Sequence, residues 1–127
     1  MQTAKTMVAV VENDSTVCEA IARLLRAAGF RAETFFSGES FLNSENRQNA
    51  ACLVLDIHLT GMSGFDVEER LATAGSRVPV IFITADETSE VRERAKGTHC
   101  SALLYKPVEA EKLIPMVRRA VEPETGR

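Results

Sequence analysis

The sequence predicts an α/β fold in which helices cover both faces of a parallel five-stranded sheet. Short apolar runs rich in Val, Ile and Leu recur along the chain, as in strands buried on both sides. Between these runs, apolar residues repeat at helical spacing, and such alternation of strand and helix is typical of parallel sheets. The chain has 127 residues, 45% of them hydrophobic, which is enough for one domain with a modest core.

The first half of the chain contains three predicted strands and two predicted helices. Met7–Val11 is a continuous, β-branched apolar run, and turn and cap residues from Glu12 to Ser15 end it. A helix follows, and Gly29 is a natural stop for it. The other elements of this half are a strand at Arg31–Phe35, a short helix at Ser37–Leu42 and a strand at Cys52–Leu55 that ends at Asp56.

The second half continues the alternation after a loop from Ile57 to Ser63. Its predicted elements are a helix carrying Phe65, Val67 and Leu71, a strand at Val78–Ile83, a polar helix at Asp86–Lys96, a strand at Ala102–Tyr105 and a helix at Glu109–Val121. Pro115 lies beyond the first turn of the last helix and removes one backbone hydrogen bond. We therefore expect a kink there, or a later start of that helix.

Composition excludes several classes of protein. The formal net charge of -3 argues against direct binding of nucleic acid, which usually needs a basic face. The chain has neither an apolar run long enough for a membrane span nor a secretory signal, so a cytoplasmic protein is expected. Its three cysteines are widely spaced, which predicts reduced, mostly buried thiols rather than disulfides or a zinc site.

Polar side chains follow four of the five predicted strands. Glu12 and Asn13 follow the first strand, Asp56 the third, Thr84 the fourth and Lys106 the fifth. Ligands of open parallel sheets bind at the carboxyl ends of the strands, so these groups are expected to meet at one edge. Polar residues end strands in any protein, but that alone does not explain a different chemical group at each position.

These groups suit phosphoryl transfer. A carboxylate such as Asp56 can accept a phosphoryl group and form an acyl phosphate. Mg²⁺ prefers oxygen ligands, which Glu12 and Asn13 offer, and it neutralises phosphoryl oxygens. The Lys106 ammonium and the Thr84 hydroxyl can each contact another phosphoryl oxygen.

The chain resembles the receiver domain of bacterial two-component response regulators, from about Met7 to Val121. Each matching segment is short, but their order and spacing together are specific. The segments are Val10-Val11-Glu12-Asn13-Asp14, Leu53-Val54-Leu55-Asp56, Gly61-Met62-Ser63-Gly64, Ile83-Thr84-Ala85 and Lys106-Pro107. The resemblance implies a flavodoxin-like (βα)5 three-layer sandwich with strand order 2-1-3-4-5. The sequence around Asp56 and from Ile81 to Ala85 most resembles receivers of nitrogen-fixation-type regulators, which carry a LuxR-type helix-turn-helix after the receiver.

The resemblance also implies a role for each site residue. Asp56 is the expected phosphoacceptor, and Mg²⁺ is the expected cofactor. The implied metal ligands are Glu12, Asn13, Asp56 and the backbone carbonyl of His58. The phosphoryl-binding and switch residues are Thr84, Ala85 and Lys106, with Leu103 at the usual aromatic switch position. His58 and Asp86 are expected to tune the phosphoryl lifetime, and Gly64 to permit the tight loop after the site.

The implied function is a phosphorylation-controlled switch rather than a metabolic enzyme. A sensor histidine kinase or phosphotransfer protein donates the phosphoryl group, and the domain assists its own phosphotransfer. The surface formed by the helix at 86–96, the strand at 102–105 and the helix at 109–121 then binds an effector or a second copy. Residues 1–127 are expected to form a single receiver domain with its core at about 7–121, and 122–127 a polar tail or the start of a linker.

The sequence departs from the family pattern at several positions. Asn13 stands where a metal-binding acid is usual, so weaker metal binding and slower phosphorylation are expected. Thr60 replaces a common proline, which predicts a less rigid loop. Leu103 replaces an aromatic residue, and Tyr105 is predicted to have the wrong strand parity to substitute for it. Asp14 is expected to cap the first helix.

Two alternatives compete with the phosphorylated switch. Asn13 and the altered switch residues also fit an atypical receiver that serves as a phosphorylation-independent interaction module. A haloacid-dehalogenase-type phosphatase also uses an aspartate nucleophile, but there it follows the first strand, with a second aspartate two residues later. Here Asp56 follows the third strand and His58 takes the second place.

Overall fold

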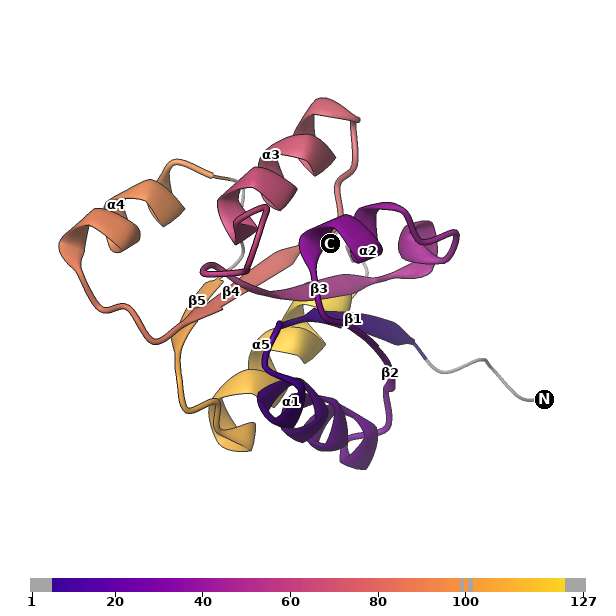
Figure 1. Ribbon diagram of the computed structural model, residues 1–127. Coiled ribbons are helices and arrows are strands. Elements are labelled where there is room, and N and C mark those ends of the chain that lie inside the picture. Colours follow the sequence, from indigo (N-terminus) through magenta and orange to yellow (C-terminus); the bar gives the residue numbers. More distant parts are fainter. Residues whose placement is uncertain (1–5, 99, 101, 123–127) are drawn as a thin grey trace, which may run out of the picture.

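A computed structural model describes residues 6–98, 100 and 102–122, and these form one five-stranded parallel sheet (Figure 1). The strands are β1 (Met7–Val11), β2 (Arg31–Phe35), β3 (Cys52–Asp56), β4 (Val80–Thr84) and β5 (Ala102–Tyr105). The helices are α1 (Ser15–Ala27), α2 (Gly38–Leu42), the 3-10 helix η1 (Arg47–Asn49), α3 (Gly64–Thr73), α4 (Ser89–Lys96) and α5 (Ala110–Val121). The strand order β2-β1-β3-β4-β5 confirms the predicted flavodoxin-like fold.

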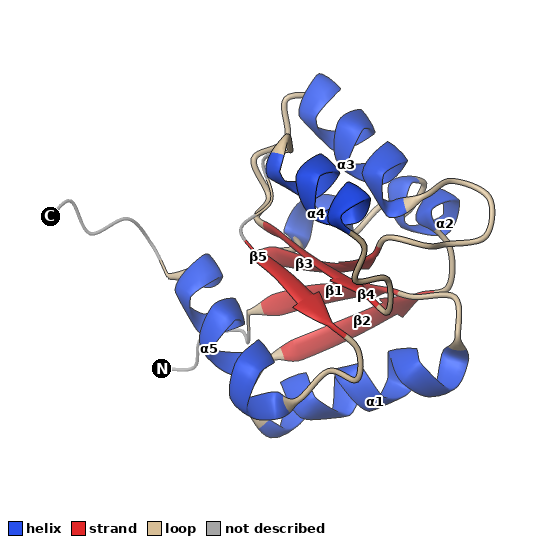
Figure 2. Ribbon diagram, turned by 90° about the vertical axis from the view of Figure 1, so that its left-hand side faces the viewer, coloured by secondary structure: helices blue, strands red, loops and turns tan. Residues whose placement is uncertain are grey.

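The sheet is sandwiched between two layers of helices (Figure 2). Helices α1 and α5 cover one face, where Ile21, Leu25 and Leu113 pack against Val10 and Val54 of the central strands. Helices α2, α3 and α4 cover the other face and bury the alternate strand residues, which are Met7, Ala9, Val11, Leu53, Leu55, Val80 and Phe82. Burial on both faces explains why the central strands are apolar along their length, apart from Asp56 and Thr84 at the carboxyl ends of β3 and β4.

The strand order directs the polar ends of the strands to one edge. The chain moves from β1 outward to β2, and then returns to place β3 on the other side of β1. Loops therefore diverge between β1 and β3, the kind of switch point at which parallel sheets bind ligands. The register pairs Val11 with Leu55 and Asp56 with Ile83, so the residues after β1 lie beside the end of β3.

Several element boundaries differ from the prediction. Strand β4 begins at Val80 rather than Val78, and helix α4 begins at Ser89 because Thr88 caps it through a bond to Val91 N. Helix α5 runs from Ala110 without a later start at Pro115. The short helix η1 was not predicted. The polar tail was expected at 122–127, of which 123–127 lie outside the described residues.

Local capping explains where two helices begin at the site edge. The Asp14 side chain accepts hydrogen bonds from Thr16 N and Val17 N, which confirms its predicted role at the start of α1. Ser63 and Asp66 form a reciprocal capping box at the start of α3. These caps fix where the loops after β1 and β3 end and the helices α1 and α3 begin.

The remaining expectations about composition concern the cysteines and membrane spans. Cys18 and Cys52 are buried, Cys100 is half-buried and all three are free, as predicted. Among the described residues, every helix is too short or too polar to cross a bilayer.

Candidate functional site

Three ionisable side chains converge at the carboxyl edge of the sheet. Nζ of Lys106 lies 2.6 Å from Oε1 of Glu12 and 3.1 Å from Oδ2 of Asp56. Glu12 follows β1, Asp56 ends β3 and Lys106 follows β5, so three strands supply the cluster. The two carboxylates are almost fully buried, with exposed fractions of 1% and 3%. The Lys106 side chain keeps 22% exposure, so the cluster opens to solvent on the lysine side.

The electrostatics of this cluster make Asp56 an unusual carboxyl. Burial raises its pKa to about 6, and the nearby charge of Glu12 adds to the rise, while the Lys106 ammonium opposes it. Burial lowers the pKa of Lys106, but its bond to Glu12 and the charge of Asp56 outweigh burial, so the net shift is upward. Lys106 therefore stays charged, and Asp56 titrates closer to neutrality than an exposed aspartate.

Asn13 is not part of this cluster. It is exposed, and its Nδ2 donates a hydrogen bond of 3.2 Å to Oγ1 of Thr60, in the loop after β3. Glu12, its neighbour, accepts a bond from Asp14 N through Oε2. The sequence analysis predicted that Glu12 and Asn13 would act together as metal ligands. In the structure, the Glu12 side chain is buried beside Lys106, whereas the exposed Asn13 amide donates a hydrogen bond to the loop after β3.

Thr84 is fully buried at the end of β4, and its hydroxyl accepts a bond from Asp86 N at 3.0 Å. The carboxylate of Asp86 accepts from Thr88 N through Oδ1 and lies 3.0 Å from Nε2 of His58 through Oδ2. The bonds made by Thr88 and His58 lower the pKa of Asp86. Asp86 thus joins the Thr84 hydroxyl, the start of α4 and the loop after β3.

The loop after Asp56 runs close to the strand end. Gly64 N donates to Ile57 O at 2.8 Å, and a Cβ on Gly64 would collide with the Asp56 carbonyl oxygen and the Ile57 backbone. His58 N also donates to Oδ1 of Asp56. The loop therefore closes tightly around the aspartate, in agreement with the role expected for Gly64.

Ala85 and Leu103 are the other positions expected to take part in switching. Ala85 is exposed, and Leu103 is half-buried against the core on the α2–α4 face. The prediction for Tyr105 was wrong, because strand side chains alternate and residues 103 and 105 share a face. The Tyr105 hydroxyl is buried without a hydrogen-bond partner among the described residues.

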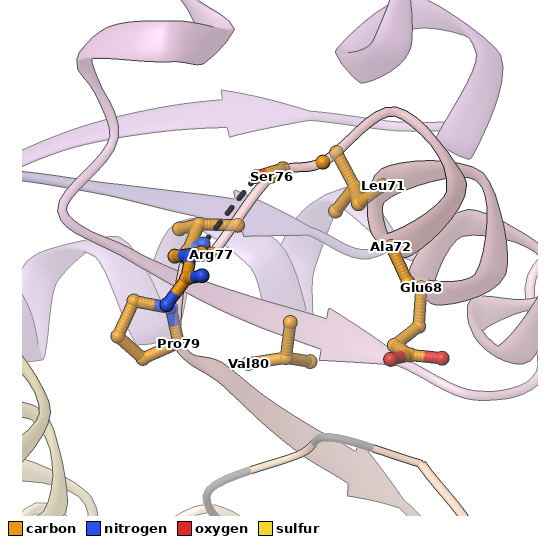
Figure 3. Close-up of a pocket in the computed structure, with 9 residues that line it drawn as sticks. Glu68, Leu71, Ala72, Ser76, Arg77, Pro79 and Val80 are labelled. Atoms are coloured by element: carbon orange, nitrogen blue, oxygen red, sulfur yellow. Dashed lines mark hydrogen bonds between the residues drawn. The ribbon is translucent and has the colours of Figure 1, made fainter.

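A cavity lies away from the ionisable cluster (Figure 3). It encloses about 580 Å³ between the end of α3 and the start of β4. Figure 3 shows Glu68 and Arg77 on different sides of it, with Pro79 and Val80 along one wall. Because this cavity lies at the amino end of β4, it is separate from the cluster around Asp56 at the carboxyl edge of the sheet.

A protein-family model matches most of this chain. The model described as the response regulator receiver domain matches residues 8–118. The chain belongs to this family. The receiver domain is the input module of two-component signalling, and such domains are in general phosphoacceptors rather than metabolic enzymes. They generally use Mg²⁺ and interact with histidine kinases.

Curated relatives support this assignment. The response regulator protein TmoT of Ectopseudomonas mendocina is 31% identical over 122 residues, which cover 96% of this chain and 56% of that protein. The sensory transduction protein RegX3 of Mycolicibacterium smegmatis is 39% identical over 115 residues, covering 89% of this chain and 49% of RegX3. This receiver domain therefore spans about half the length of these relatives.

Solved structures agree with the fold. A response regulator receiver protein from Burkholderia phymatum superposes with a TM-score of 0.80 at 39% identity, covering 92% of this chain and 95% of that one. The BeF3-activated receiver domain of DrrB, a Thermotoga maritima protein, gives a TM-score of 0.84 at 27% identity and covers 94% of this chain and 100% of that one.

The sequence missed the side-chain contacts that connect the loops. The sequence analysis noted Thr60 only because it replaces a common proline. No local sequence pattern indicates that it contacts Asn13. The contact between His58 and Asp86 joins residues 28 positions apart. Glu39 of α2 was also missed, although its carboxylate accepts a bond from Met62 N in the loop after β3. A search for polar residues in loops that follow adjacent strands would have suggested the first two contacts, but not Glu39, which lies within α2.

Proposed function

We propose that this receiver domain is a phosphorylation-controlled switch in which Asp56 accepts a phosphoryl group from a histidine kinase or phosphotransfer protein. The observation that carries the proposal is the contact of one ammonium, on Lys106, with the carboxylates of Asp56 and Glu12. A buried aspartate beside a fixed cation is suited to gain a dianionic group, because the cation already balances part of its charge.

Transfer forms one bond and breaks another. A carboxylate oxygen of Asp56 attacks phosphorus, the P–N bond of the donor phosphohistidine breaks, and the departing imidazole nitrogen takes a proton from solvent. Lys106 remains protonated and contacts a phosphoryl oxygen, and the Thr84 hydroxyl at the next strand end donates to another after it turns toward the group. Hydrolysis later returns the carboxylate and releases inorganic phosphate.

The residues that the family resemblance implies as metal ligands have a chemistry that fits Mg²⁺. They offer only oxygens: the carboxylates of Glu12 and Asp56, the amide oxygen of Asn13 and the backbone carbonyl of His58. Mg²⁺ favours such ligands and retains several waters. When bound, it supplies neutralisation of phosphoryl charge. Within the described ranges, no three His, Cys, Asp or Glu side chains cluster to hold a metal. Because Asn13 replaces the acid that is usual in the family, we expect weak binding of Mg²⁺.

Thr84 connects the site to a surface that partners can bind. Its hydroxyl accepts from Asp86 N, and the Asp86 carboxylate accepts from Thr88 N at the start of α4. Only Val91 and Ala95 of α4 are buried, so this helix is lightly anchored. If Thr84 turns toward a phosphoryl group, the bond to Asp86 breaks and α4 is free to shift. The proposed output is altered binding of an effector or a second copy by α4, β5 and α5.

The second candidate is a phosphorylation-independent interaction module. The observation that favours it is the uncharged, exposed Asn13 side chain beside Glu12, which brings no negative charge to attract a metal ion. In that case Lys106 serves only to neutralise Glu12 and Asp56, and partners bind the unphosphorylated surface.

Intact-mass spectrometry after incubation with acetyl phosphate separates these candidates. The chain is incubated with and without Mg²⁺, alongside Asp56→Asn and the matched control Asp66→Asn on α3. The switch predicts the Mg²⁺-dependent gain of one phosphoryl group by the native chain and the control, and none by Asp56→Asn. Labelling that persists in Asp56→Asn contradicts Asp56 as the acceptor.

Failure of the native chain to gain a phosphoryl group contradicts the switch once a second variant is tested. If Asn13→Asp then acquires Mg²⁺-dependent labelling, the acceptor machinery is intact and the native metal site is disabled. That result supports the interaction module. The sequence contains no tryptophan, so mass rather than intrinsic tryptophan fluorescence is the appropriate signal.

A further inference from the structure

A side-chain hydrogen bond joins the loop that follows β1 to the loop that follows β3. Nδ2 of Asn13, which directly follows Glu12, donates to Oγ1 of Thr60, four residues after Asp56. The donor and acceptor lie 3.2 Å apart, and the residues are 47 positions apart in the chain. Both side chains are exposed, so neither needs this bond to satisfy a buried polar group.

In the structure, the bond to Thr60 uses the nitrogen end of the Asn13 amide. A side-chain amide has a nitrogen that only donates and an oxygen that only accepts, and only the oxygen can ligate a cation. Because Thr60 receives the nitrogen, Oδ1 is the uncommitted end, and it makes no hydrogen bond to other residues in the described part of the chain. An amide turned the other way would direct N–H groups at the metal and repel it.

We propose that Thr60 is a positioning residue for Mg²⁺, because its hydroxyl holds the Asn13 amide with Oδ1 available as a ligand. This inference rests on the proposed Mg²⁺-dependent phosphoacceptor function. The terminal torsion of an asparagine is broad and roughly twofold, so a free amide samples both orientations. Partners that orient a metal ligand in this way commonly change metal affinity by about 10-fold or more.

The importance of Thr60 should depend on whether residue 13 is asparagine or aspartate. Both ends of an aspartate carboxylate are oxygens, so an acid at position 13 needs no partner to present the correct atom. Thr60 should therefore matter when residue 13 is asparagine and matter little when it is aspartate. A merely structural role for Thr60 in its loop would affect both backgrounds equally.

Magnesium titrations of the ¹⁵N-labelled chain, followed by NMR at constant ionic strength, test this. The native chain is compared with Thr60→Val, which keeps the branched shape, and with Thr60→Ser, which keeps the hydroxyl. Thr73→Val, at an exposed position at the end of α3, is the matched control. Because the bond is exposed, we expect Thr60→Val to weaken Mg²⁺ binding by about 3- to 10-fold. Thr60→Ser and the control should bind as the native chain does.

The same titrations in an Asn13→Asp background complete the cycle. There, Thr60→Val should change the Mg²⁺ affinity by less than about twofold. The Asn13 side-chain NH₂ resonances provide a second signal, because they should shift on adding Mg²⁺ to the native chain and broaden or move in Thr60→Val without metal. Equal losses in the two backgrounds overturn the proposal, as does unchanged or tighter binding by Thr60→Val.

Failure here is distinguishable from failure of the proposed function. Acetyl phosphate labelling of Asp56 is measured on the same samples. A native chain that is labelled but does not bind Mg²⁺ measurably overturns the role of Thr60 and leaves Asp56 as a phosphoacceptor. A native chain that binds Mg²⁺ with the expected dependence on Thr60 but is never labelled supports the positioning role and contradicts the switch.

Discussion

Nζ of Lys106 lies 2.6 Å from Oε1 of the buried Glu12. The same nitrogen contacts Asp56 at 3.1 Å. One positive charge therefore serves two buried carboxylates, and the cluster keeps a net negative charge when both are ionised. Burial raises the pKa of Asp56 and the charge of Glu12 adds to the rise, so mutation and pH should both act on the domain through this cluster.

Asp56→Asn is expected to stabilise the domain near neutral pH. The pKa of Asp56 rises from 3.8 to about 6 on folding, so ionised Asp56 disfavours the folded state. That cost is present above pH 6, shrinks as pH falls through 6 and is lost below about 3.8. We expect a gain of about 1 to 3 kcal/mol in unfolding free energy at pH 7. Urea denaturation in EDTA at several pH values measures it.

The matched control is Asp14→Asn, which makes the same chemical change at an exposed helix cap. Asparagine caps helices about as well as aspartate, so a change within about 0.5 kcal/mol is expected there. A gain for Asp56→Asn that does not diminish in acid would contradict the assignment of this cost to ionised Asp56.

Lys106→Met is expected to destabilise the domain near neutral pH. The substitution leaves Glu12 and Asp56 buried with no counter-charge, and breaking such a pair from one side costs about 2 to 4 kcal/mol. The loss should be smaller in acid, where Asp56 is protonated. Lys112→Met, on the exposed surface of α5, should change stability by less than about 0.5 kcal/mol. Similar losses for the two lysines, measured by urea denaturation, would refute this view of the cluster.

Gly64→Ala should disturb the loop that encloses Asp56. Its Cβ would meet the carbonyl oxygen of Asp56 and lie 2.8 Å from the Cα of Ile57, and backbone atoms cannot move aside cheaply. A loss of about 1 to 3 kcal/mol is expected. Gly97→Ala is the control, because Gly97 has ordinary helical geometry and its Cβ would meet only Arg94 O, at 3.5 Å. Thermal denaturation that ranks Gly97→Ala as the more harmful change would contradict this prediction.

His58→Ala is expected to shorten the lifetime of the phosphorylated domain. Nε2 of His58 bonds to Asp86, so the pair connects the loops after β3 and β4 beside Asp56. Losing this exposed bond should admit water and speed hydrolysis by about 2- to 5-fold, with little effect on stability. Decay of the phosphorylated mass with time measures it. His58→Gln, which can still donate to Asp86, should retain the native lifetime, and equally fast decay of the two variants would exclude the bridge as the cause.

The cysteines should differ sharply in reactivity toward iodoacetamide. Burial raises the pKa of Cys18 to about 11 and that of Cys52 to about 12, and neither side chain is accessible. Cys100 is half-buried and should be alkylated first. Peptide mapping after brief treatment of the folded domain would contradict this order if Cys18 or Cys52 carried the label before Cys100.

Much of the fold was predictable because both of its patterns are local. Runs such as Met7–Val11 and Cys52–Leu55 show burial on both faces, and apolar spacing such as that of Ile21 and Leu25 shows a helix with one buried face. The boundaries were less predictable. Residues 86–88 have a helix-like polar composition, but the Asp86 and Thr88 side chains bond to backbone N–H groups and delay the start of α4 to Ser89.

The sequence by itself determined which chemical groups reach the site, because each residue that directly follows a parallel strand must lie at the carboxyl edge of the sheet. It could not determine how those groups contact one another. That Lys106 serves Glu12 as well as Asp56, that Asn13 bonds to Thr60, and that Asp86 links His58 to Thr84 were decided by tertiary structure alone. These contacts join residues far apart in the chain, and their geometry depends on how sheet packing and loop closure bring separate strand ends within hydrogen-bonding distance.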